Sequence, residues 1–554
     1  MKNNICYLKP NVVIEPLVGR WYAWSHLISP STAALNVTGR HLKIMNSYIK
    51  FPETHAAAVR NPKMLGGPFM DYKQVRVDDI EHLKEQTTTR QGKLVELAKA
   101  IKELDALLKT HAKGFSLEPL YDMVPDLLKG FVELHYDLNH NPSFRFFESL
   151  LYDSEFYLKD TQSIALWLTN NDERPFCLST PRLDENDVLH LPVPFDHSGI
   201  DMLSKMKRTG GKIEEVAELL GVTAEQMPLF ENFFTTEEHP PYRKYEGPHV
   251  RMRYFGHACI LIEIKDISIL VDPLISYYGY ESNVSHFSDI DLPDEIDYVL
   301  ITHNHQDHIL LETLLPLRHK IKNILIPRTT GGALQDPSLK LLFNALGFKN
   351  VIEIDDLEEI RFGNVVVTGV PFTGEHSDLN IRAKTCFHVL INDYSFLFVA
   401  DSRVMEKRLY EHVWQKLGDV DVIFLGMECD GAPLSWLYGP LLSEELARDK
   451  DQSRRLSGSD YRKGLHLVDI FHPQELYVYA MGQEPWLEFI STVQYTDESN
   501  PIIESNRLIK TCIERGIIAE RLFGEKEILY KSESRQPKPQ HESTRSVDQV
   551  TAGL

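Results

Sequence analysis

The chain has 554 residues, of which 43% are hydrophobic, enough to form buried cores, and this composition excludes a wholly disordered protein. Lys and Arg number 59 against 80 Asp and Glu, and the net charge of −21 argues against binding a nucleic-acid backbone or an anionic membrane surface. At roughly 100–200 residues per domain, the length is compatible with two large domains or three to four smaller ones.

The six cysteines are widely scattered and form no CxxC pair, as expected for free thiols in a reducing compartment. Lys9, Pro10, Glu15 and Pro16 interrupt the apolar residues near the N-terminus, so no signal peptide is expected. No run approaches the roughly 18 apolar residues that are needed to span a bilayer. We therefore predict a cytoplasmic protein with neither a membrane nor a nucleic acid as partner.

The N-terminal part has mixed patterns. Residues 1–72 are rich in aromatic side chains and predict strands and loops. Residues 75–136 predict helices, because apolar residues recur at three- and four-residue spacing over 94–108 and again over 120–131. Further short helices are expected over 203–234. Such amphipathic helices usually bury one face as scaffold.

A polar linker separates this part from a different pattern. Residues 235–242 contain the pair Pro240-Pro241, which ends regular structure, so we expect an N-terminal mixed α/β accessory domain over 1–245. Beyond the linker, β-branched and aromatic segments alternate with helical ones. The strands are predicted at 250–264, 267–271, 298–302, 323–327, 364–371, 395–401, 421–426 and 475–480.

The alternation over 246–530 opens with two antiparallel strands joined at Lys265-Asp266. It predicts a second α/β domain in which two sheets are sandwiched between helices, an αββα arrangement. The remaining segment, 531–554, is rich in Ser, Gln, Pro and charged residues and predicts a disordered tail.

The strongest chemical signal is a cluster of histidines after a predicted strand. His303, His305, Asp307 and His308 directly follow the apolar segment 298–301. Imidazole and carboxylate groups are ligands that suit Zn, Fe or Mn. Four potential ligands this close are too many for one ion with an open position, so two metal ions are expected.

The spacing His-x-His-x-Asp-His resembles the signature of the metallo-β-lactamase superfamily, and the resemblance covers residues 250–529. It implies a metallo-β-lactamase-like αββα sandwich. Asp401, at a predicted strand end, would then bridge the two metals. Asp272 and His257 would support the histidine loop without binding metal themselves.

The segment around Glu375 narrows the resemblance. Ordinary members of the superfamily use a histidine after a glycine, which here would be His376, but Glu375 lies next to Gly374. This arrangement, together with the long N-terminal part, resembles the diiron β-hydroxylases of nonribosomal peptide biosynthesis, such as the chloramphenicol-pathway enzyme. That resemblance extends over almost the whole chain and favours Glu375 as the ligand, with His376 as the alternative.

The resemblance implies a complete diiron site. His303, His305 and Glu375 would hold one iron, Asp307 and His308 the other, and Asp401 would bridge them. The superfamily usually supplies a further ligand after the last strand, where this chain has no histidine. The candidate for this seventh position is His466, in the predicted helix 459–471.

Two acidic residues are candidates for substrate binding. Glu428 and Asp430 follow the predicted strand 421–426 and therefore lie at the same rim as the metals. Either could bind the ammonium group of a substrate, or could instead face solvent.

The family resemblance implies an O₂-dependent monooxygenase. It would hydroxylate the β-carbon of an amino acid tethered as a thioester to the phosphopantetheine of a thiolation domain, with electrons from an external donor. The N-terminal domain would contribute to a substrate tunnel and to a homodimer. Aromatic and branched aliphatic amino acids, such as leucine, are both compatible. The alternative is a dizinc hydrolase of the same fold that cleaves an ester, thioester or phosphodiester.

Overall fold

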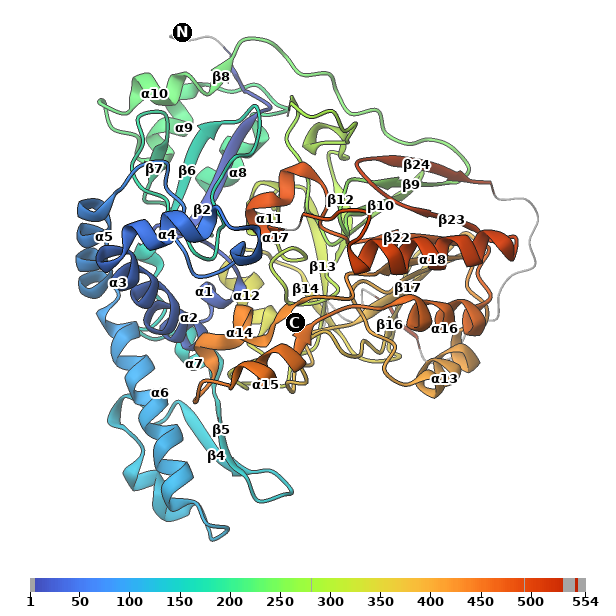
Figure 1. Cartoon of the computed structure of the whole chain (residues 1–554). Helices are drawn as coiled ribbons and strands as arrows, with labels where there is room; N and C mark the ends of the chain where they lie inside the picture. Colours follow the sequence, from blue (N-terminus) through green and yellow to red (C-terminus); the bar gives the residue numbers. More distant parts are fainter. Residues whose placement is uncertain (1–4, 280, 493, 532–543, 547–554) are drawn as a thin grey trace.

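The computed structural model describes residues 5–279, 281–492, 494–531 and 544–546. Two large β-sheets lie face to face in the C-terminal part of the chain. The N-terminal part, blue to green in Figure 1, packs beside them, and a long connection before β9 (Val250–Tyr254) runs along the outside of the molecule.

The first sheet contains the predicted hairpin, in which Ile264 pairs with Ile267. Its strands β11 to β14 run parallel, and β9, β10 and β24 complete it in antiparallel fashion. The order across the described sheet is β14 (Val351–Ile354), β13 (Ile321–Pro327), β12 (Ile296–Leu300), β11 (Ile267–Val271), β10 (Ile260–Ile264), β9 and β24 (Lys526–Tyr530).

The second sheet has a parallel half, formed by β18, β19, β22 and β23, and an antiparallel half. The order across the described sheet is β23 (Ile518–Arg521), β22 (Glu475–Tyr479), β19 (Val422–Gly426), β18 (Tyr394–Phe398), β17 (Cys386–Ile391), β16 (Val365–Val370), β15 (Glu359–Phe362) and β25 (Thr544–Ser546).

Side chains alternate between the two faces of each sheet, as a period of two requires. Ile260 and Ile262 of β10 join the core between the sheets, whereas Leu261 faces the other side. In the second sheet Phe396 faces the same core and Leu397 faces away. Three helices bury this outer face of the second sheet: α13 (Lys407–Leu417), α16 (Tyr461–Phe471) and α18 (Asn500–Glu514).

The N-terminal part contains a four-stranded antiparallel sheet with the order β3 (Trp21–Tyr22), β2 (Val12–Val18), β6 (Gln162–Leu168) and β7 (Leu189–Leu191). Two strand pairs accompany it, β1 (Tyr7–Leu8) with β8 (Phe234–Thr235) and β4 (Val132–Tyr136) with β5 (Pro142–Phe146). Its helices are α1 (Ser25–Ile28), α2 (Pro30–Asn36), α3 (Leu42–Lys50), α4 (Pro52–Val59), α5 (Val77–Arg90), α6 (Gly92–His111), α7 (Glu148–Tyr152), α8 (Ser198–Lys205), α9 (Ile213–Leu220) and α10 (Met227–Glu231).

Two predictions for this part are wrong. Residues 1–72 were expected as strands and loops, but most of 25–59 is helical, because small residues such as Ala33 and Ala34 pack against α6. The second apolar stripe, over 120–131, forms 3₁₀ turns that lead into β4 rather than a helix. Pro125 interrupts this stripe and has no N–H to continue a helix.

The N-terminal part packs over the outer face of the first sheet, together with the helices of the C-terminal part that lie on this face. One hydrophobic core contains Ile14 and Trp24 from the N-terminal part together with Leu261, Val299 and Ile324 from the first sheet. Helices α11 (Leu311–Leu317) and α12 (Leu339–Ala345) contribute to the same core. The two parts therefore share buried surface continuously across their junction.

A buried ionic network reinforces this junction. The Arg174 guanidinium lies 2.7 Å from Glu312 of α11, 3.0 Å from Glu15 of β2 and 2.6 Å from Asp172, and Arg182 lies 2.9 Å from Glu15. Because buried charges are tolerated only when they are paired, this network depends on both parts being in place.

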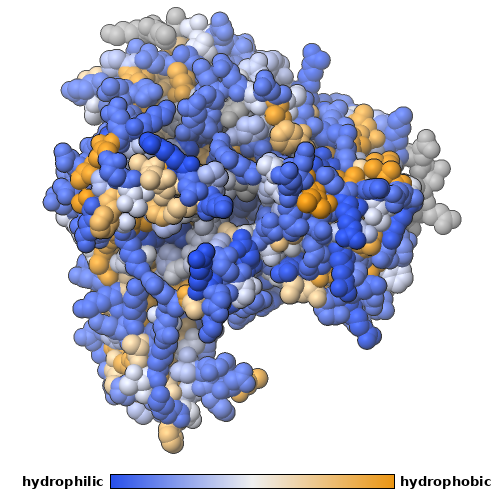
Figure 2. Space-filling model, viewed as in Figure 1, coloured by the Kyte–Doolittle hydropathy of each residue, from blue (hydrophilic) through white to orange (hydrophobic). Residues whose placement is uncertain are grey.

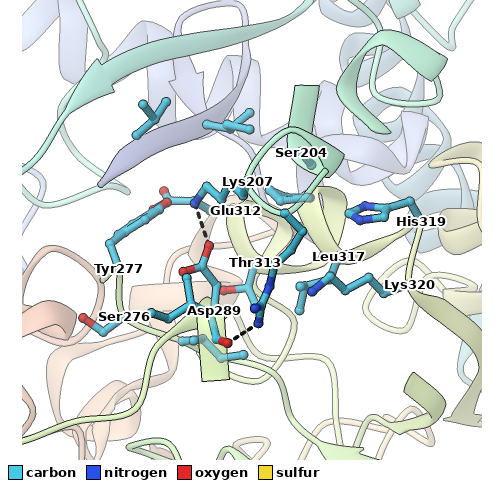
Figure 3. Close-up of a pocket in the computed structure, with 16 residues that line it drawn as sticks. Ser204, Lys207, Ser276, Tyr277, Asp289, Glu312, Thr313, Leu317, His319 and Lys320 are labelled. Carbon is cyan, nitrogen blue, oxygen red and sulfur yellow. Dashed lines mark hydrogen bonds and ion pairs between the residues drawn. The ribbon is translucent and has the colours of Figure 1, made fainter. Parts of the chain in front are cut away.

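A cavity of about 40 Å³ lies beside the network, with room for only a few water molecules. Figure 3 shows Lys207 of the N-terminal part pointing across it toward Asp289, and the two groups form an ion pair of 2.6 Å. This cavity is a packing gap at the junction, remote from the predicted metal ligands, none of which lines it.

The predicted tail over 531–554 falls largely outside the described residues. Within it the structure describes residue 531 and strand β25, which pairs with β15. In the described part of the chain, no helix is both long and apolar enough to cross a membrane.

Candidate metal centre

The predicted metal ligands gather at one edge of the sandwich, where strands of both sheets end. The histidine motif directly follows β12, Glu375 follows β16, and Asp401 follows β18. Strands β16 and β18 are both antiparallel to β17, so their carboxyl ends open on the same edge. The topology therefore brings together side chains that lie far apart in the sequence.

Three groups of potential ligand atoms occur among the described residues, and within each group the atoms lie within 4.8 Å of one another. His303 and His308 each belong to two groups, so the three groups form one continuous centre with room for two ions. The groups are His303 with His305 and Glu375, His303 with His308 and Asp401, and His257 with Asp307 and His308.

Asp401 lies between the two halves of this centre. Its Oδ2 atom is 3.1 Å from Nε2 of His308 and 3.7 Å from Nε2 of His303. A carboxylate between two imidazoles from the two halves has the position that a bridging ligand needs.

Asp272 fixes the histidine loop from behind. Its carboxylate accepts hydrogen bonds from the Thr302 backbone N–H at 2.8 Å and the Thr302 hydroxyl at 2.6 Å, and it lies 2.8 Å from Nδ1 of His308. His308 therefore presents Nε2 to the centre. Burial disfavours a charged imidazole, but the carboxylates of Asp272 and Asp401 hold the pKa of His308 well above its usual value.

Glu375 reaches the centre and His376 lies behind it. Glu375 Oε1 is 2.8 Å from Nδ1 of His305, and its Oε2 is 2.8 Å from Nδ1 of His376. The His376 ring stacks on His305 with centroids 4.4 Å apart, but it belongs to none of the three ligand groups. Despite burial, the two histidines hold the pKa of Glu375 well below its ordinary range.

His257 lies closer to the centre than its expected supporting role requires. Its Nε2 atom is 3.2 Å from Oδ2 of Asp307, and the geometry makes it a potential ligand together with Asp307 and His308. The backbone N–H of His257 donates a 3.0 Å hydrogen bond to Glu484, which holds the residue in place.

The structure does not bring His466 to the centre. His466 lies on α16, whose buried residues pack on the outer face of the second sheet, and it is absent from the ligand groups found among the described residues. The prediction of His466 as a metal ligand is therefore wrong, because a helix that covers the face of the sheet does not direct this side chain to the strand ends.

Two polar atoms at the centre are buried without a hydrogen-bond partner in the described structure. They are Nε2 of His303 and Oδ1 of Asp401. Leaving such groups unpaired is costly, whereas metal ions would satisfy them. Because imidazole and carboxylate ligands suit iron, zinc or manganese, the residues fit a dinuclear metal site.

Tyr438 contacts His305, and the sequence did not predict this contact. Its hydroxyl lies 3.1 Å from Nε2 of His305, so His305 is oriented to present Nδ1 to the centre. Tyr438 is 133 residues away in the sequence, and no local pattern links it to the histidine motif.

A cavity of about 890 Å³ leads from the centre to the surface. Figure 2 shows this face of the molecule hollowed between the N-terminal part and the elements α14 (Leu434–Tyr438) and α17 (Glu488–Ser491). Its outer wall includes the N-terminal segment 63–69, α15 (Arg448–Ser453) and the strand pair of β20 (Ala432–Pro433) with β21 (Arg455–Leu456).

The two predicted substrate-binding carboxylates differ in position. Glu428 lines the cavity together with Asp401 and Glu375. Asp430 is exposed, does not line the cavity, and accepts a 3.1 Å hydrogen bond from Asn500. The structure thus separates two residues that the sequence treats alike, since only Glu428 contributes to the wall of the cavity.

Two facing sheets with a dinuclear His, Asp and Glu centre at their strand ends define a metalloprotein of the metallo-β-lactamase superfamily. A family model described as a β-lactamase superfamily domain matches residues 268–432. A second, described as the N-terminal domain of diiron non-haem β-hydroxylases, matches residues 7–238.

Full-length comparisons give the family. The chain is 39% identical over 523 residues to the 4-amino-L-phenylalanyl-[CmlP-peptidyl-carrier-protein] 3-hydroxylase of Streptomyces venezuelae, covering 93% of this chain and 98% of that protein. The crystal structure of CmlA, a diiron β-hydroxylase from Streptomyces venezuelae, matches with a TM-score of 0.89 at 37% identity, covering 95% of this chain and all of that one. The chain belongs to the diiron non-haem β-hydroxylases and is an oxygenase with two iron ions as cofactor.

Proposed function

We propose that this enzyme hydroxylates the β-carbon of an amino acid that is held as a thioester on the thiolation domain of a nonribosomal peptide synthetase. The Streptomyces venezuelae relative acts on an aminoacyl group carried by a peptidyl carrier protein, and the alignment spans nearly all of both chains. A carrier-bound substrate also accounts for the wide cavity.

The cavity is the observation that carries this proposal. At about 890 Å³ it lies near the upper end of the range for small-molecule sites, and it runs from the metal ligands to the surface past residues 63–69. A long flexible arm needs such a passage. Near the centre, Leu437, Met481 and Ile490 provide apolar contact that suits an aromatic or branched aliphatic side chain.

We assign the ligands from the three geometric groups. His303, His305 and Glu375 would hold one iron, while Asp307, His308 and His257 would hold the other, with Asp401 between them. Bound iron would supply the activation of O₂ and the one-electron chemistry that breaks the C–H bond. The protein positions the β-carbon, keeps the histidine tautomers fixed and limits water around the reacting atoms.

We also propose the electron donor, oligomeric state, location and domain roles that the sequence predicts. The enzyme would take electrons from an external reductase and act as a homodimer in the cytoplasm. The N-terminal part, residues 1–245, would form one wall of the substrate passage, and residues 246–530 would form the catalytic domain. Support for the shared passage is that residues 63–69 line the same cavity as the metal ligands.

Mass spectrometry tests the reaction directly. The iron-loaded, reduced enzyme is incubated with O₂ and thiolation domains that carry different amino acids, and the carrier is analysed intact. We expect one aminoacyl carrier to gain the mass of one oxygen atom, with the label following ¹⁸O₂. Two bound zinc ions, together with release of the amino acid and no uptake of O₂, would contradict the proposal and favour a hydrolase.

A further inference from the structure

One carboxyl group in the wall of the metal cavity is held in place but has no cationic partner among the described residues. Glu428 directly follows Met427 at the end of β19 and lines the cavity beside Asp401. Its Oε2 atom accepts a hydrogen bond from the backbone N–H of Gly431, and its carbonyl oxygen accepts one of 2.7 Å from Gly458. The side chain is therefore fixed by its own backbone turn.

The surroundings of Glu428 are negative. Within the described structure, no Lys, Arg or His nitrogen forms an ion pair with its carboxylate, and Asp430 adds a negative charge nearby. Tyr495 lies beside it as a neutral partner. Burial raises the pKa of Glu428 to about 7.

The cations of the cavity wall do not neutralise this group. The Arg455 guanidinium is directed to the carbonyl oxygens of Asp430 and Gly431 and to the side chain of Gln452. Lys63 and Arg448 also line the cavity, but neither forms an ion pair with Glu428. A fixed, unpaired carboxyl group that faces a cavity is suited to a cation supplied by the ligand.

We propose that Glu428 binds the α-ammonium group of the tethered aminoacyl substrate and thereby selects aminoacyl over simple acyl carriers. The inference rests on the proposed function, because that substrate carries its ammonium group on the α-carbon, which is adjacent to the β-carbon. An ammonium held at Glu428, in the wall of the same cavity as Asp401, would direct the β-carbon toward the metal ligands. The binding is an ion pair and requires no covalent step.

A substrate that lacks the amino group provides the sharpest test. Thiolation domains are loaded with L-phenylalanine or 3-phenylpropanoate, and with L-leucine or 4-methylpentanoate, and kcat/KM is measured for the pair whose amino member reacts faster. For the wild type we expect the amino member to be preferred by about 10- to 100-fold, the range for loss of a charge-assisted contact. Glu428→Gln should lower kcat/KM for the amino member by a similar factor and leave the acyl member within about twofold.

Asp430→Asn is the matched control, because it removes a carboxylate two residues away that is exposed and does not line the cavity. It should preserve the preference, and Glu428→Asp should retain part of it. Iron content and circular dichroism are measured for every variant. If Glu428→Gln cannot be purified folded, absence of any preference in the wild type still overturns the proposal.

The outcomes separate the two proposals. A wild type that hydroxylates the amino and acyl members equally well contradicts the role of Glu428 but leaves the proposed function intact. An equal loss for both members in Glu428→Gln also contradicts it, since Glu428 would then act on the metals or on the chemistry. A wild type that hydroxylates no loaded carrier contradicts the proposed function itself.

Discussion

Several residues around the metal centre adopt a backbone conformation that L-amino acids rarely tolerate. His257, Asp272, Glu375, Ala400 and Ala480 all have positive φ, between +41° and +63°, and all lie on the connections at the same edge of the sandwich. Such conformations cost free energy and persist only where the surrounding structure enforces them. Here they turn the chain sharply after each strand, so that neighbouring side chains point into one centre.

Glu375 is the residue that separates this site from the usual histidine pattern. We expect Glu375→Ala to lose iron and to lower hydroxylation by more than about 100-fold, above the range for residues that only support a ligand. His376→Ala should cost less, because His376 contacts Glu375 and His305 without belonging to the ligand groups. Iron analysis and carrier mass spectrometry measure both variants, and a larger loss in His376→Ala would reverse the assignment.

Asp272 offers a test of support without direct ligation. Asp272→Asn keeps the shape of the side chain but removes the charge that lies 2.8 Å from Nδ1 of His308. We expect metal affinity to fall by about 10- to 100-fold while the fold is retained. Competition with a chelator measures the affinity. An unchanged affinity would mean that Thr302 alone positions the loop.

At the scale of elements, the end of strand β19 is packed too tightly to accept a side chain. A Cβ atom at Gly426, the last residue of β19, would lie 2.3 Å from Oδ1 of Asp401 and 2.7 Å from the carbonyl oxygen of Ala400. Absence of a side chain at Gly426 therefore leaves the space that the carboxylate of Asp401 occupies. The order of strands β18 and β19 and this small residue act together to place Asp401.

We expect Gly426→Ala to displace Asp401, to reduce iron content and to destabilise the fold by about 1–3 kcal/mol. Gly92→Ala is the matched control, because a Cβ there meets nothing within 4 Å and Gly92 lies at the start of α6. The control should be neutral or more stable by about 0.5–1 kcal/mol. Thermal unfolding and iron analysis measure both, and a fully loaded Gly426→Ala enzyme would contradict the packing argument.

At the scale of the whole molecule, the N-terminal part packs onto the helical side of the first sheet. Its core is continuous with the outer face of the first sheet. The ion pair of Arg174 with Glu312 joins the N-terminal part to α11. Helix α11, which carries Glu312, begins shortly after His308. The position of the histidine loop therefore depends on docking of the N-terminal part.

A buried carboxyl at this junction predicts a dependence of stability on pH. Glu148 of α7 accepts a 2.9 Å hydrogen bond from the backbone N–H of Ser338, and burial raises its pKa from 4.5 to about 7. The folded protein keeps this proton to higher pH than the unfolded chain. The contribution of Glu148 to the free energy of unfolding is thus greatest below pH 4.5 and decreases by roughly 3 kcal/mol as pH rises to 7.

Glu148→Gln cannot titrate, so its free energy of unfolding should fall less than that of the wild type between pH 5 and 8. Urea unfolding at a series of pH values measures the difference, with the exposed Glu53→Gln as a control that follows the wild type. Parallel pH profiles for the wild type and Glu148→Gln would show that water reaches this carboxyl and that the junction is looser than described.

The sequence by itself determined the chemistry of the centre. The motif from His303 to His308 could be found from its short spacing after a strand, whereas the roles expected for Glu375 and Asp401 came from the family resemblance. The alternation of strand and helical segments over 246–530 likewise predicted two sheets between helices.

Only the tertiary structure decided which distant residues join the centre. His257 and Tyr438 approach the histidine motif through the pairing of strands and the packing of α14, whereas α16 holds His466 on the outer face of a sheet. Glu428 and Asp430 are alike in sequence, but only Glu428 lines the cavity. These contacts depend on the order of strands and on buried packing between segments far apart in the chain, which no local spacing encodes.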